Sequence, residues 1–559
     1  MSNYLSPAQA LPADVLRSII KWVVNEKKSP FVEASCQLGK LKELLIISST
    51  WRQAALEFLW KQLHLIVNVP SNDVCLKRPN WLIHNMLPHN AASLAKKIHV
   101  LVPMSSIVLG VAHKLLVSYI GSTKCFPFVY NLTVKITDVK DQHYVAKDVA
   151  ISNAIEFAKL LKSMAPDAKT VNMLCTDDPW RTSSRNKNRV KELDEEILEV
   201  LADVLYSNAK RALLDLFQVD VNNLATFNAI PPLSRLRIHR QKSPDMHASL
   251  VHKSANTLQY LAIRMHYANM LIYDTNGNAV IYPNLQHLQL STDSANPTDS
   301  NIMITKKVIF PVLRTLRLPF SYPFNDDVLF RGNTATLEYL DARFNHDTIL
   351  MLNKSLVFES KNKVLRNVKI NWPSVDMDTA EWPRVDTNKC FSHLVSAAKI
   401  LTVSNEGVAN VCAIAAQYGQ GFQNIKVFDV HSGDLLFSDV ICLLNLLPAL
   451  VELRGGINGL GPEFENISPE ELLDYMASIY CGAGRNLQIW RVYSITDRYN
   501  INVTNYVLLL ALASPRLRRI EIKPDNVKDY HARVTKALES GPYSKYASQF
   551  NKLLDVAFW

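Results

Sequence analysis

A short apolar pattern recurs along the second half of the chain and limits what the chain can fold into. The pattern is Leu-x-x-Leu-x-Leu, in which other apolar residues also occupy the leucine positions. The clearest copies are Leu233/Leu236/Ile238, Leu258/Leu261/Ile263, Leu285/Leu288/Leu290, Leu313/Leu316/Leu318, Leu337/Leu340/Ala342 and Leu365/Val368/Ile370. Less regular copies are Ala398/Leu401/Val403, Ile425/Phe428/Val430, Leu487/Trp490/Val492 and Leu517/Ile520/Ile522, with a partial copy at Leu450/Leu453. The mean interval is about 28 residues, a period typical of stacked repeats rather than of one globular core.

A repeat of this length predicts one short strand and one helix or turn in each unit. Weaker copies lie upstream, at Ala95/Ile98/Val100, Val129/Leu132/Val134, Ala168/Val171/Met173 and Leu214/Phe217/Val219. Apolar residues at helical spacing predict helices between the strands, over 151–164, 190–208, 391–398, 407–418, 438–447, 469–480 and 505–513. We therefore predict an α/β fold in which an irregular leucine-rich-repeat solenoid, a horseshoe, occupies residues 71–559, with its clearest repeats over 233–523.

Residues 1–70 predict a short helical domain in front of the repeats. Leu11 and Pro12 open an amphipathic run whose stripe includes Val15, Leu16 and Ile19, and proline suits the first turn of a helix. A second apolar stretch includes Leu44. A third helix is predicted from Thr50, whose spacing to Gln53 is that of a capping box. Its apolar pattern continues through Trp51, Leu59, Trp60, Leu63 and Leu65.

Three short helices that begin with Leu-Pro and later carry Trp-Arg and Leu-Trp resemble an F-box. The matching residues are Leu11, Pro12, Leu16, Ile19, Leu44, Trp51, Arg52, Leu59 and Trp60. Ile47-Ser48 stands where the family has Val-Cys, and the connector over 25–40 is longer than the family usually carries. Together with the repeats, the chain resembles the F-box/leucine-rich-repeat proteins, and segments such as Tyr282-Pro-Asn-Leu285 resemble a large group of fungal proteins of this kind.

No sequence signature of catalysis is present. The 15 histidines form no His-Glu-x-x-His or other metal-ligand spacing, and the glycine-rich stretch 455–461 lacks the Lys-Ser/Thr of a phosphate loop, so we read it as a plain loop. The eight scattered cysteines include no Cys-x-x-Cys pair and indicate reduced thiols. We therefore expect no enzyme, no cofactor and no metal. The absence of a signal peptide and of a long apolar span predicts an intracellular protein, in the cytoplasm, the nucleus or both, without a membrane partner.

The candidate binding surface is the concave side of the predicted horseshoe. Residues that flank the second and third pattern positions point away from the core, because side chains alternate along a strand. They include Arg235, Arg237, His239, Tyr260, Arg264, His287, Arg317, Tyr339, Arg343, Lys369 and Arg491. Among all flanking positions nine Arg or Lys residues face three acids, Asp341, Asp429 and Glu521. This excess predicts a basic groove for an acidic or phosphorylated protein segment, or else a solvated face that follows the overall charge of +10.

The function implied by the resemblance is that of a substrate-recognition adaptor of an SCF-type cullin-RING ubiquitin ligase. The faces around Leu11, Pro12, Val15, Leu16, Ile19, Leu44, Trp51, Leu59 and Trp60 would dock the Skp-type adaptor, and the repeats would hold a protein substrate. The alternatives are a repeat scaffold without a ligase role, in which the head only caps the array, and a nucleic-acid-binding repeat protein. Nucleic-acid binding is the least supported of these functions, because the basic loop over 181–191 contains no interleaved aromatic residue.

Overall fold

The chain is described by a computed structural model that covers most predicted repeats. It describes residues 62–67, 91–120, 125–137, 145–175, 192–207, 209–221, 231–241, 245–265, 269–274, 276–292, 307–319, 336–343, 365–372, 385–457, 486–495 and 516–522, parts of 11–18, 50–54 and 468–474, and residues 329, 349, 514, 539 and 544. Contacts divide the chain into two units, and each is described by itself. Unit 1 comprises residues 1–266 and 270–282, and unit 2 comprises 267–269 and 283–559.

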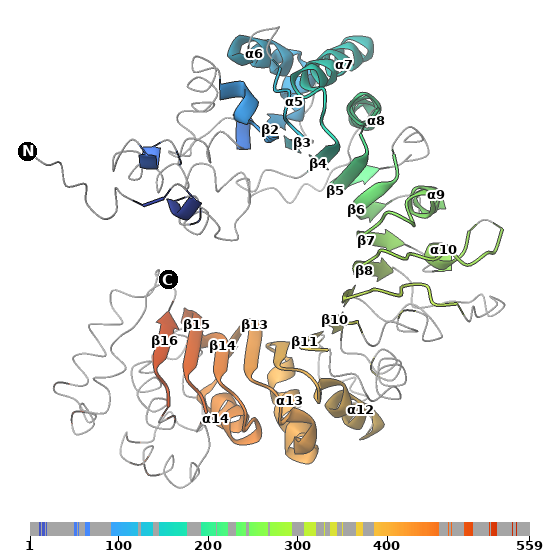
Figure 1. The fold of residues 1–559 in the computed structure, drawn as a ribbon. Coiled ribbons are helices and arrows are strands. Elements are labelled where there is room, and N and C mark those ends of the chain that lie inside the picture. The colour runs from blue at the N-terminus through green and yellow to red at the C-terminus, as the bar shows by residue number, and fades with distance from the viewer. Residues whose placement is uncertain are drawn as a thin grey trace, which may run out of the picture. The chain divides into compact units, whose positions relative to one another are not determined.

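Unit 1 is built on a ladder of parallel strands in sequence order (Figure 1). The strands are β1 (Gln62–Ile66), β2 (Lys97–Pro103), β3 (Asn131–Thr137), β4 (Thr170–Cys175), β5 (Arg211–Val221), β6 (Leu233–Gln241) and β7 (Tyr260–Met265). Its helices are η2 (Ala91–Leu94), α5 (Met104–Val108), α6 (Val111–Ile120), α7 (Lys147–Met164), α8 (Glu192–Tyr206), α9 (Asp245–Lys253) and α10 (Asn269–Ile272). Helices join successive strands because parallel neighbours require a crossover connection.

Unit 2 repeats this arrangement. Its strands are β8 (His287–Thr292), β9 (Thr315–Leu318), β10 (Tyr339–Arg343), β11 (Asn367–Asn371), β12 (Ile400–Ser404), β13 (Val427–Leu435), β14 (Glu452–Ile457), β15 (Ile489–Ile495) and β16 (Arg519–Ile522). Its helices are α12 (Val385–Val395), α13 (Gly407–Gln417), η5 (Gly419–Phe422) and α14 (Phe437–Leu446). Figure 1 shows α12, α13 and α14 on one side of this ladder.

The repeated apolar residues form the core of each unit. Middle residues of successive copies pair across the ladder, as Leu316 does with Leu340 and Val368 with Leu401. The pattern residues whose side chains are described are buried, and among them Trp490, at a middle position, is the largest fully buried side chain of unit 2. The pairing confirms the predicted repeat register over these strands. Because each strand is short, burial against its two neighbours supplies most of its stability.

Three predictions about the positions of strands were wrong. Leu63 and Leu65 belong to β1, which pairs with β2, so the ladder begins before residue 71. Their burial together with Val67 follows the two-residue period of a strand and not a helical stripe. In β5, Leu214 rather than Phe217 pairs with Leu236, the middle residue of the next copy. Gly455 and Gly456 lie in β14 and not in a loop.

Most predicted helices are confirmed, with shifts at their ends. The helices predicted at 151–164, 190–208, 407–418 and 438–447 correspond to α7, α8, α13 and α14. The helix predicted at 391–398 begins earlier and ends at Val395, since Ala398 is already the buried first residue of the next repeat. Most of the helices predicted at 469–480 and 505–513, and the basic loop over 181–191, lie outside the described residues.

Candidate functional site on the open faces of the strand ladders

Each strand ladder has one face turned to the core and one turned away from it, which we call the open face. In β10 and β11 burial alternates along the strand, with Leu340, Ala342, Val368 and Ile370 buried and their neighbours partly exposed. In these two strands the residues that flank the pattern positions therefore lie on the open face. The open face is therefore where a binding surface was predicted.

The structure divides the predicted binding residues between the two units. Arg235 and Arg237 lie in β6 and Tyr260 in β7 of unit 1. Those of unit 2 are His287 in β8, Arg317 in β9, Tyr339 and Arg343 in β10, Lys369 in β11 and Arg491 in β15. His239 and Arg264 lie in β6 and β7, but their side chains are outside the described part of the chain.

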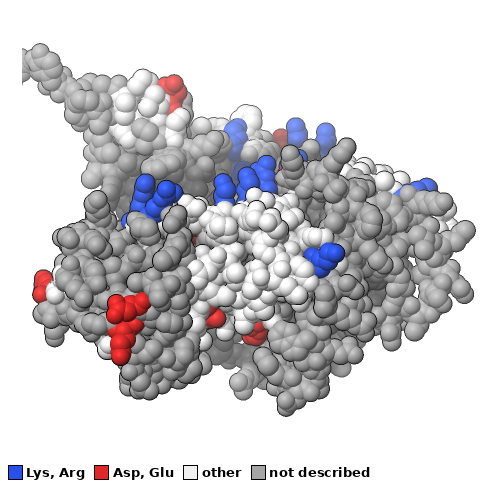
Figure 2. Space-filling model, turned by 90° about the horizontal axis from the view of Figure 1, so that it is seen from below, with Lys and Arg blue, Asp and Glu red and all other residues white. Residues whose placement is uncertain are grey.

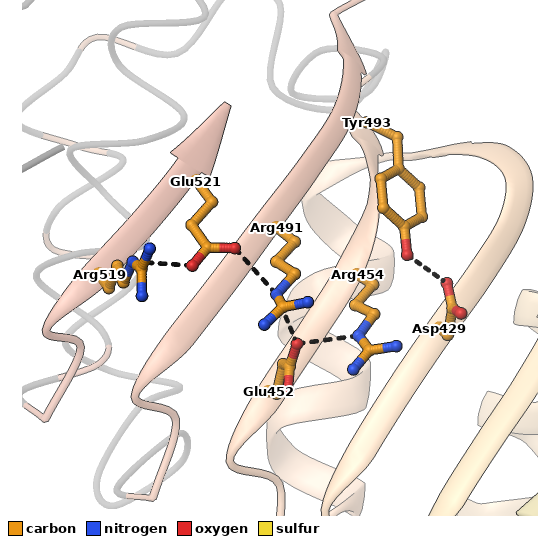
Figure 3. A network of polar contacts seen from close by, with 7 residues as sticks. All are labelled: Asp429, Glu452, Arg454, Arg491, Tyr493, Arg519 and Glu521. Atoms are coloured by element: carbon orange, nitrogen blue, oxygen red, sulfur yellow. Dashed lines mark hydrogen bonds and ion pairs between the residues drawn. The ribbon is translucent and has the colours of Figure 1, made fainter. Parts of the chain in front are cut away.

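The most extensive polar network lies on the open face of unit 2, across β13 to β16 (Figure 3). We call it the charged ladder; it comprises Asp429, Glu452, Arg454, Arg491, Tyr493, Arg519 and Glu521. Arg454 Nε donates to Glu452 Oε1 over 2.9 Å, and Arg491 Nε lies 2.8 Å from the same oxygen. Arg491 Nε is also 2.9 Å from Glu521 Oε2, and Arg519 Nε is 2.7 Å from Glu521 Oε1. Three guanidinium groups and two carboxylates thus alternate across three strands.

Register explains why these side chains meet. Asp429, Arg454, Arg491 and Glu521 occupy the same position in four paired strands. Glu452 and Arg519 occupy the position two residues earlier in β14 and β16, on the same face. Neighbouring parallel strands lie about 4.8 Å apart, so long charged side chains in one row reach each other.

Burial and charge set the pKa values around the ladder. Burial raises the pKa of Asp429, although the Tyr493 hydroxyl, which donates to Asp429 Oδ1 over 3.2 Å, and nearby cations oppose that rise. Burial and the Asp429 charge raise the pKa of Tyr493 to about 12. Burial works against the charge of Arg454, but its contact with Glu452 outweighs burial and raises the Arg454 pKa.

A second, smaller cluster on the open face of unit 2 is centred on Asp341. The Asn371 side-chain amide donates to Asp341 Oδ1 over 2.9 Å, and the Tyr339 hydroxyl lies 3.5 Å from Oδ2. Lys369 Nζ is 4.0 Å from Oδ2. The Arg317 guanidinium carbon lies 5.5 Å from the centre of the Tyr339 ring, within cation–π range. Three neighbouring strands, β9, β10 and β11, therefore contribute side chains to this cluster.

On β3 and β4, the open face of unit 1 carries a cluster of neutral hydrogen bonds. Asn172 Nδ2 donates to Asn131 Oδ1 over 3.1 Å and lies 3.0 Å from Thr133 Oγ1, and the Thr133 hydroxyl lies 3.2 Å from Asn131 Oδ1. We call these three residues the amide ladder. His99 pairs with Thr133 in the strand register, and burial, followed by the nearby Lys97 charge, lowers its pKa to about 4.

The two predicted arginines of β6 lie farther along the open face of unit 1. The Arg235 guanidinium carbon lies 4.2 Å from the centre of the Tyr260 ring, and the two residues pair directly across β6 and β7. A stacked guanidinium keeps its charge while its flat face is covered. The predicted combination of basic and aromatic side chains is therefore present here.

Sequence reasoning missed Glu452, Arg454 and Tyr493. The copy at Leu450/Leu453 is incomplete, so its flanking residues were left out of the predicted face, although Glu452 and Arg454 flank Leu453 in the same alternation. Their inclusion changes the charge of the surface, because Glu452 contacts two arginines. In the charged ladder the basic groups are balanced by acids and do not form an uncompensated basic groove.

The described part of the predicted head is small. Leu16 and Trp51 are buried, whereas Val15 and Pro12 are exposed. Leu16 N–H donates to the Pro12 carbonyl over 3.0 Å, which is the first turn of the predicted helix. Thr50 to Arg52 are helical as well. Ile19, Leu44, Leu59 and Trp60 lie outside the described residues.

Comparisons with known proteins add little beyond the repeat architecture. No protein family and no curated protein matches the sequence. Among solved structures, the chain is similar to the leucine-rich repeat-containing protein LegL7 from Legionella pneumophila, at 10% sequence identity and a TM-score of 0.26, over 76% of this chain and 94% of that one. A likeness of this degree says nothing about activity or partners.

No described helix has the length and apolar character to cross a membrane. No group of three or more His, Cys, Asp or Glu side chains with metal-binding geometry occurs in the same part of the chain.

Proposed function

We propose that this chain is a binding scaffold that holds a protein partner on the open face of unit 2. The observation that carries the proposal is the charged ladder, in which arginine side chains that are 26–47% exposed are held in place by carboxylates of the same strand (Arg454, Arg519) or of the two neighbouring strands (Arg491). Ordering a long side chain costs conformational entropy, and a side chain already ordered before binding does not incur that cost again. The ladder is thus preorganised for recognition.

The chemistry of the ladder indicates an acidic or phosphorylated segment as its ligand. Arg454 and Arg519 contact their carboxylates through Nε, and a guanidinium group has four further N–H donors on its two Nη atoms. Such forks bind carboxylate or phosphate oxygens in pairs. Because Glu452 and Glu521 balance much of the local charge, selectivity would come from the geometry of these pairs rather than from bulk attraction.

A peptide-binding measurement tests this proposal. The full chain is titrated with acidic and phosphorylated peptides from an array, and the comparison is with Arg454→Lys/Arg519→Lys, which keeps both charges and removes both forks. We expect a loss of about tenfold or more in affinity, since a paired charge-assisted contact is worth more than a point charge. The variant Lys389→Ala/Lys399→Ala, on exposed positions off the open face, serves as the control. Equal affinities for all three proteins would contradict the proposal.

We further propose that the head docks a Skp-type adaptor and so makes the chain the substrate-recognition subunit of an SCF-type cullin-RING ubiquitin ligase. The support is the F-box resemblance together with the exposure of Pro12 and Val15, which leaves these two positions available to a partner. Coupling in such an assembly works by raising the local concentration of the substrate beside the ligase. Leu16 and Trp51 are buried and would support the head rather than contact the adaptor.

A pull-down of the full chain with a Skp-type adaptor tests this second step. We expect Val15→Asp to abolish binding, because it places a charge in an apolar contact. Val149→Asp is the matched control, since Val149 is 50% exposed on α7 and undergoes the same chemical change. Failure of the unaltered chain to bind would leave the scaffold function without a ligase.

A further inference from the structure

A row of basic and aromatic residues lines one edge of the strand ladder of unit 1. It consists of the residues immediately before β2, β3, β4 and β5, which are Lys96, Tyr130, Lys169 and Lys210. Backbone hydrogen bonds tie these positions together: Tyr130 N–H donates to Lys96 O over 3.0 Å, and Lys210 N–H donates to Lys169 O over 3.0 Å. The Tyr130 carbonyl accepts from Thr170 over 2.9 Å. We call this row, together with Phe128, the basic-aromatic edge.

Its aromatic rings face solvent. Phe128 is 56% exposed and Tyr130 is 43% exposed, and both are among the most exposed large apolar residues in the described chain. The Lys96 ammonium lies 4.5 Å from the centre of the Phe128 ring, so a cation and an aromatic face are already combined at one end. Exposed rings beside ammonium groups offer flat faces on which the aromatic group of a ligand can stack while the cations contact its anionic groups.

The lysines of the basic-aromatic edge form no ion pair with Asp or Glu among the described residues. Lys169 and Lys210 are exposed, and the ion pairs among the described residues do not include them. In the described residues just before these four strands (91–96, 125–130, 165–169 and 209–210), Asp167 is the one acid. This contrasts with the charged ladder of unit 2, where each cation has a carboxylate partner.

The same edge of unit 2 provides a comparison. There the residues before β11, β12 and β13 are Arg366, Lys399 and Lys426, also exposed and joined by backbone hydrogen bonds. No exposed aromatic ring accompanies them among the described residues. Figure 2 shows the described Lys and Arg side chains of one face of the molecule, most of them in its upper half. Among the described residues, lysines and arginines thus occur at this edge in both units, in unit 2 together with Glu338, and exposed rings accompany them in unit 1.

We propose that the basic-aromatic edge of unit 1 binds single-stranded nucleic acid. The lysine ammonium groups would contact phosphates, and the Phe128 and Tyr130 rings would stack on bases, which is how sequence-independent single-strand sites combine charge and stacking. Strands about 4.8 Å apart place Lys96 and Lys210 about 14 Å from each other along the edge. A row of lysines matches the repeated phosphates of a nucleic-acid backbone, and every base has a flat face that can stack on a ring.

Two other classes of anionic partner fit the observations less well. An acidic peptide would pair with the lysines but has no flat groups to cover the two rings. An anionic membrane surface would require more apolar side chains inserted together than these two. The choice of a single strand over a duplex rests on the rings, because bases in a duplex are already stacked on each other.

Fluorescence anisotropy of the full chain with a labelled oligouridylate tests the proposal. The slope of log K against log salt should be about −2, as expected for three phosphate contacts with a single strand. Lys169→Ala/Lys210→Ala should reduce the slope to about −0.7, and Phe128→Ala/Tyr130→Leu should weaken binding about tenfold or more while leaving the slope unchanged. Tyr130→Phe should bind like the unaltered chain, since it keeps the ring.

Matched controls separate this site from nonspecific charge. Lys114→Ala/Lys159→Ala removes two exposed lysines from α6 and α7 of the same unit and should not alter binding. Binding that falls equally in this control, or that ignores the loss of the rings, would overturn the proposal, as would no binding at all. Polyglutamate and phosphatidylserine vesicles are the comparison ligands. Competition by either one that is lost with the lysines but not with the rings would identify a plain anion surface instead.

Discussion

The open faces of units 1 and 2 share a backbone design but stabilise it with different polar chemistry. In unit 1 the amide ladder links Asn131, Thr133 and Asn172 by neutral hydrogen bonds beside the buried His99. In unit 2 the charged ladder links guanidinium groups and carboxylates, including the buried Glu521. Neutral hydrogen bonds are insensitive to salt and ion pairs are not, so equal strand geometry leads to different responses to solution conditions.

The two open faces also differ in how many hydrogen-bond donors and charges they leave available to a partner. Amides and hydroxyls that bond each other within a row support the ladder and leave little charge for a partner. Arginines held by neighbouring acids keep most of their donors and stay partly exposed. The comparison therefore supports the proposal of protein recognition on unit 2, whereas unit 1 combines the open-face arginines of β6 with the separate basic-aromatic edge.

The largest expected effect tests the charged ladder. Arg491→Ala removes the group between Glu452 and Glu521 and leaves a carboxylate that is 2% exposed with one cation. We expect a loss of about 3–5 kcal/mol in the local stability of β14 to β16, because Glu452 and Glu521, both little exposed, each lose one of two charge-assisted contacts and each such contact is worth about 1.5–3 kcal/mol. Hydrogen exchange of the peptides that span these strands measures it.

Two further variants test whether the effect of Arg491→Ala comes from charge. Arg343→Ala, at an exposed open-face position of β10, should change stability by less than about 0.5 kcal/mol. The combined change Glu452→Gln/Arg491→Met/Glu521→Gln should recover much of the loss, since no unpaired charge remains. A loss as large in the combined variant as in Arg491→Ala would show that packing, and not charge, explains the effect.

An intermediate effect is expected from pH in unit 1. The folded state lowers the pKa of His99 to about 4 through burial and the Lys97 charge, whereas the unfolded chain has a pKa near 6.5. The unfolded state therefore binds the proton more tightly, and the stability contributed above pH about 6.5 is lost as pH falls through 4. The change is on the order of 2–3 kcal/mol in the strands β2 to β4. Hydrogen exchange of these strands between pH 7 and pH 4 measures it.

The matched variant for this pH effect is His99→Gln, which does not titrate. Its unit 1 strands should keep the same stability from pH 7 to pH 4 after correction for intrinsic exchange rates. A pH response in the variant equal to that of the unaltered chain would assign the effect to another group.

The smallest expected effect is a difference between the two ladders in how salt changes their local stability. Asn172→Ala removes the donor of two hydrogen bonds and should destabilise β3 and β4 by about 1–2 kcal/mol at any ionic strength. Raising salt from about 0.1 M to 1 M should weaken β14 to β16 by about 0.5–1 kcal/mol in the unaltered chain, because part of the charged ladder is exposed. A salt response of equal size in both units would remove the distinction between them.

Much of the fold was predictable because the core pattern is local and repeated. Each Leu-x-x-Leu-x-Leu copy sets which side chains of one short strand are buried, and the same copy spaced by about 28 residues implies the stacking of strands. The errors arose where the copy was weak. In β5 the small residue Ala212 lies opposite Leu233, the first pattern position of the next copy, so the pattern was assigned to the wrong residues. Strand β1 directly follows an apolar helical stripe, so its residues were predicted as part of that helix.

The candidate site was predictable only in part. Alternation from the pattern residues identified Arg317, Tyr339, Lys369 and Arg491 as open-face positions, since that step needs no tertiary information. The balance of charge could not be read in the same way, because it depends on which strand lies beside which and on how far a side chain reaches across.

The repeat period, the order of strand and helix within each repeat, and the side chains that point away from the core all follow from the local sequence pattern. Tertiary structure alone decided that Arg491 sits between Glu452 and Glu521, that Asn172 joins Asn131, and that Lys96, Tyr130, Lys169 and Lys210 form one row. The physical reason is distance along the chain. Burial of a strand residue follows from its immediate neighbours in sequence, whereas contacts between side chains of separate repeats exist only after parallel pairing has brought those repeats within about 5 Å.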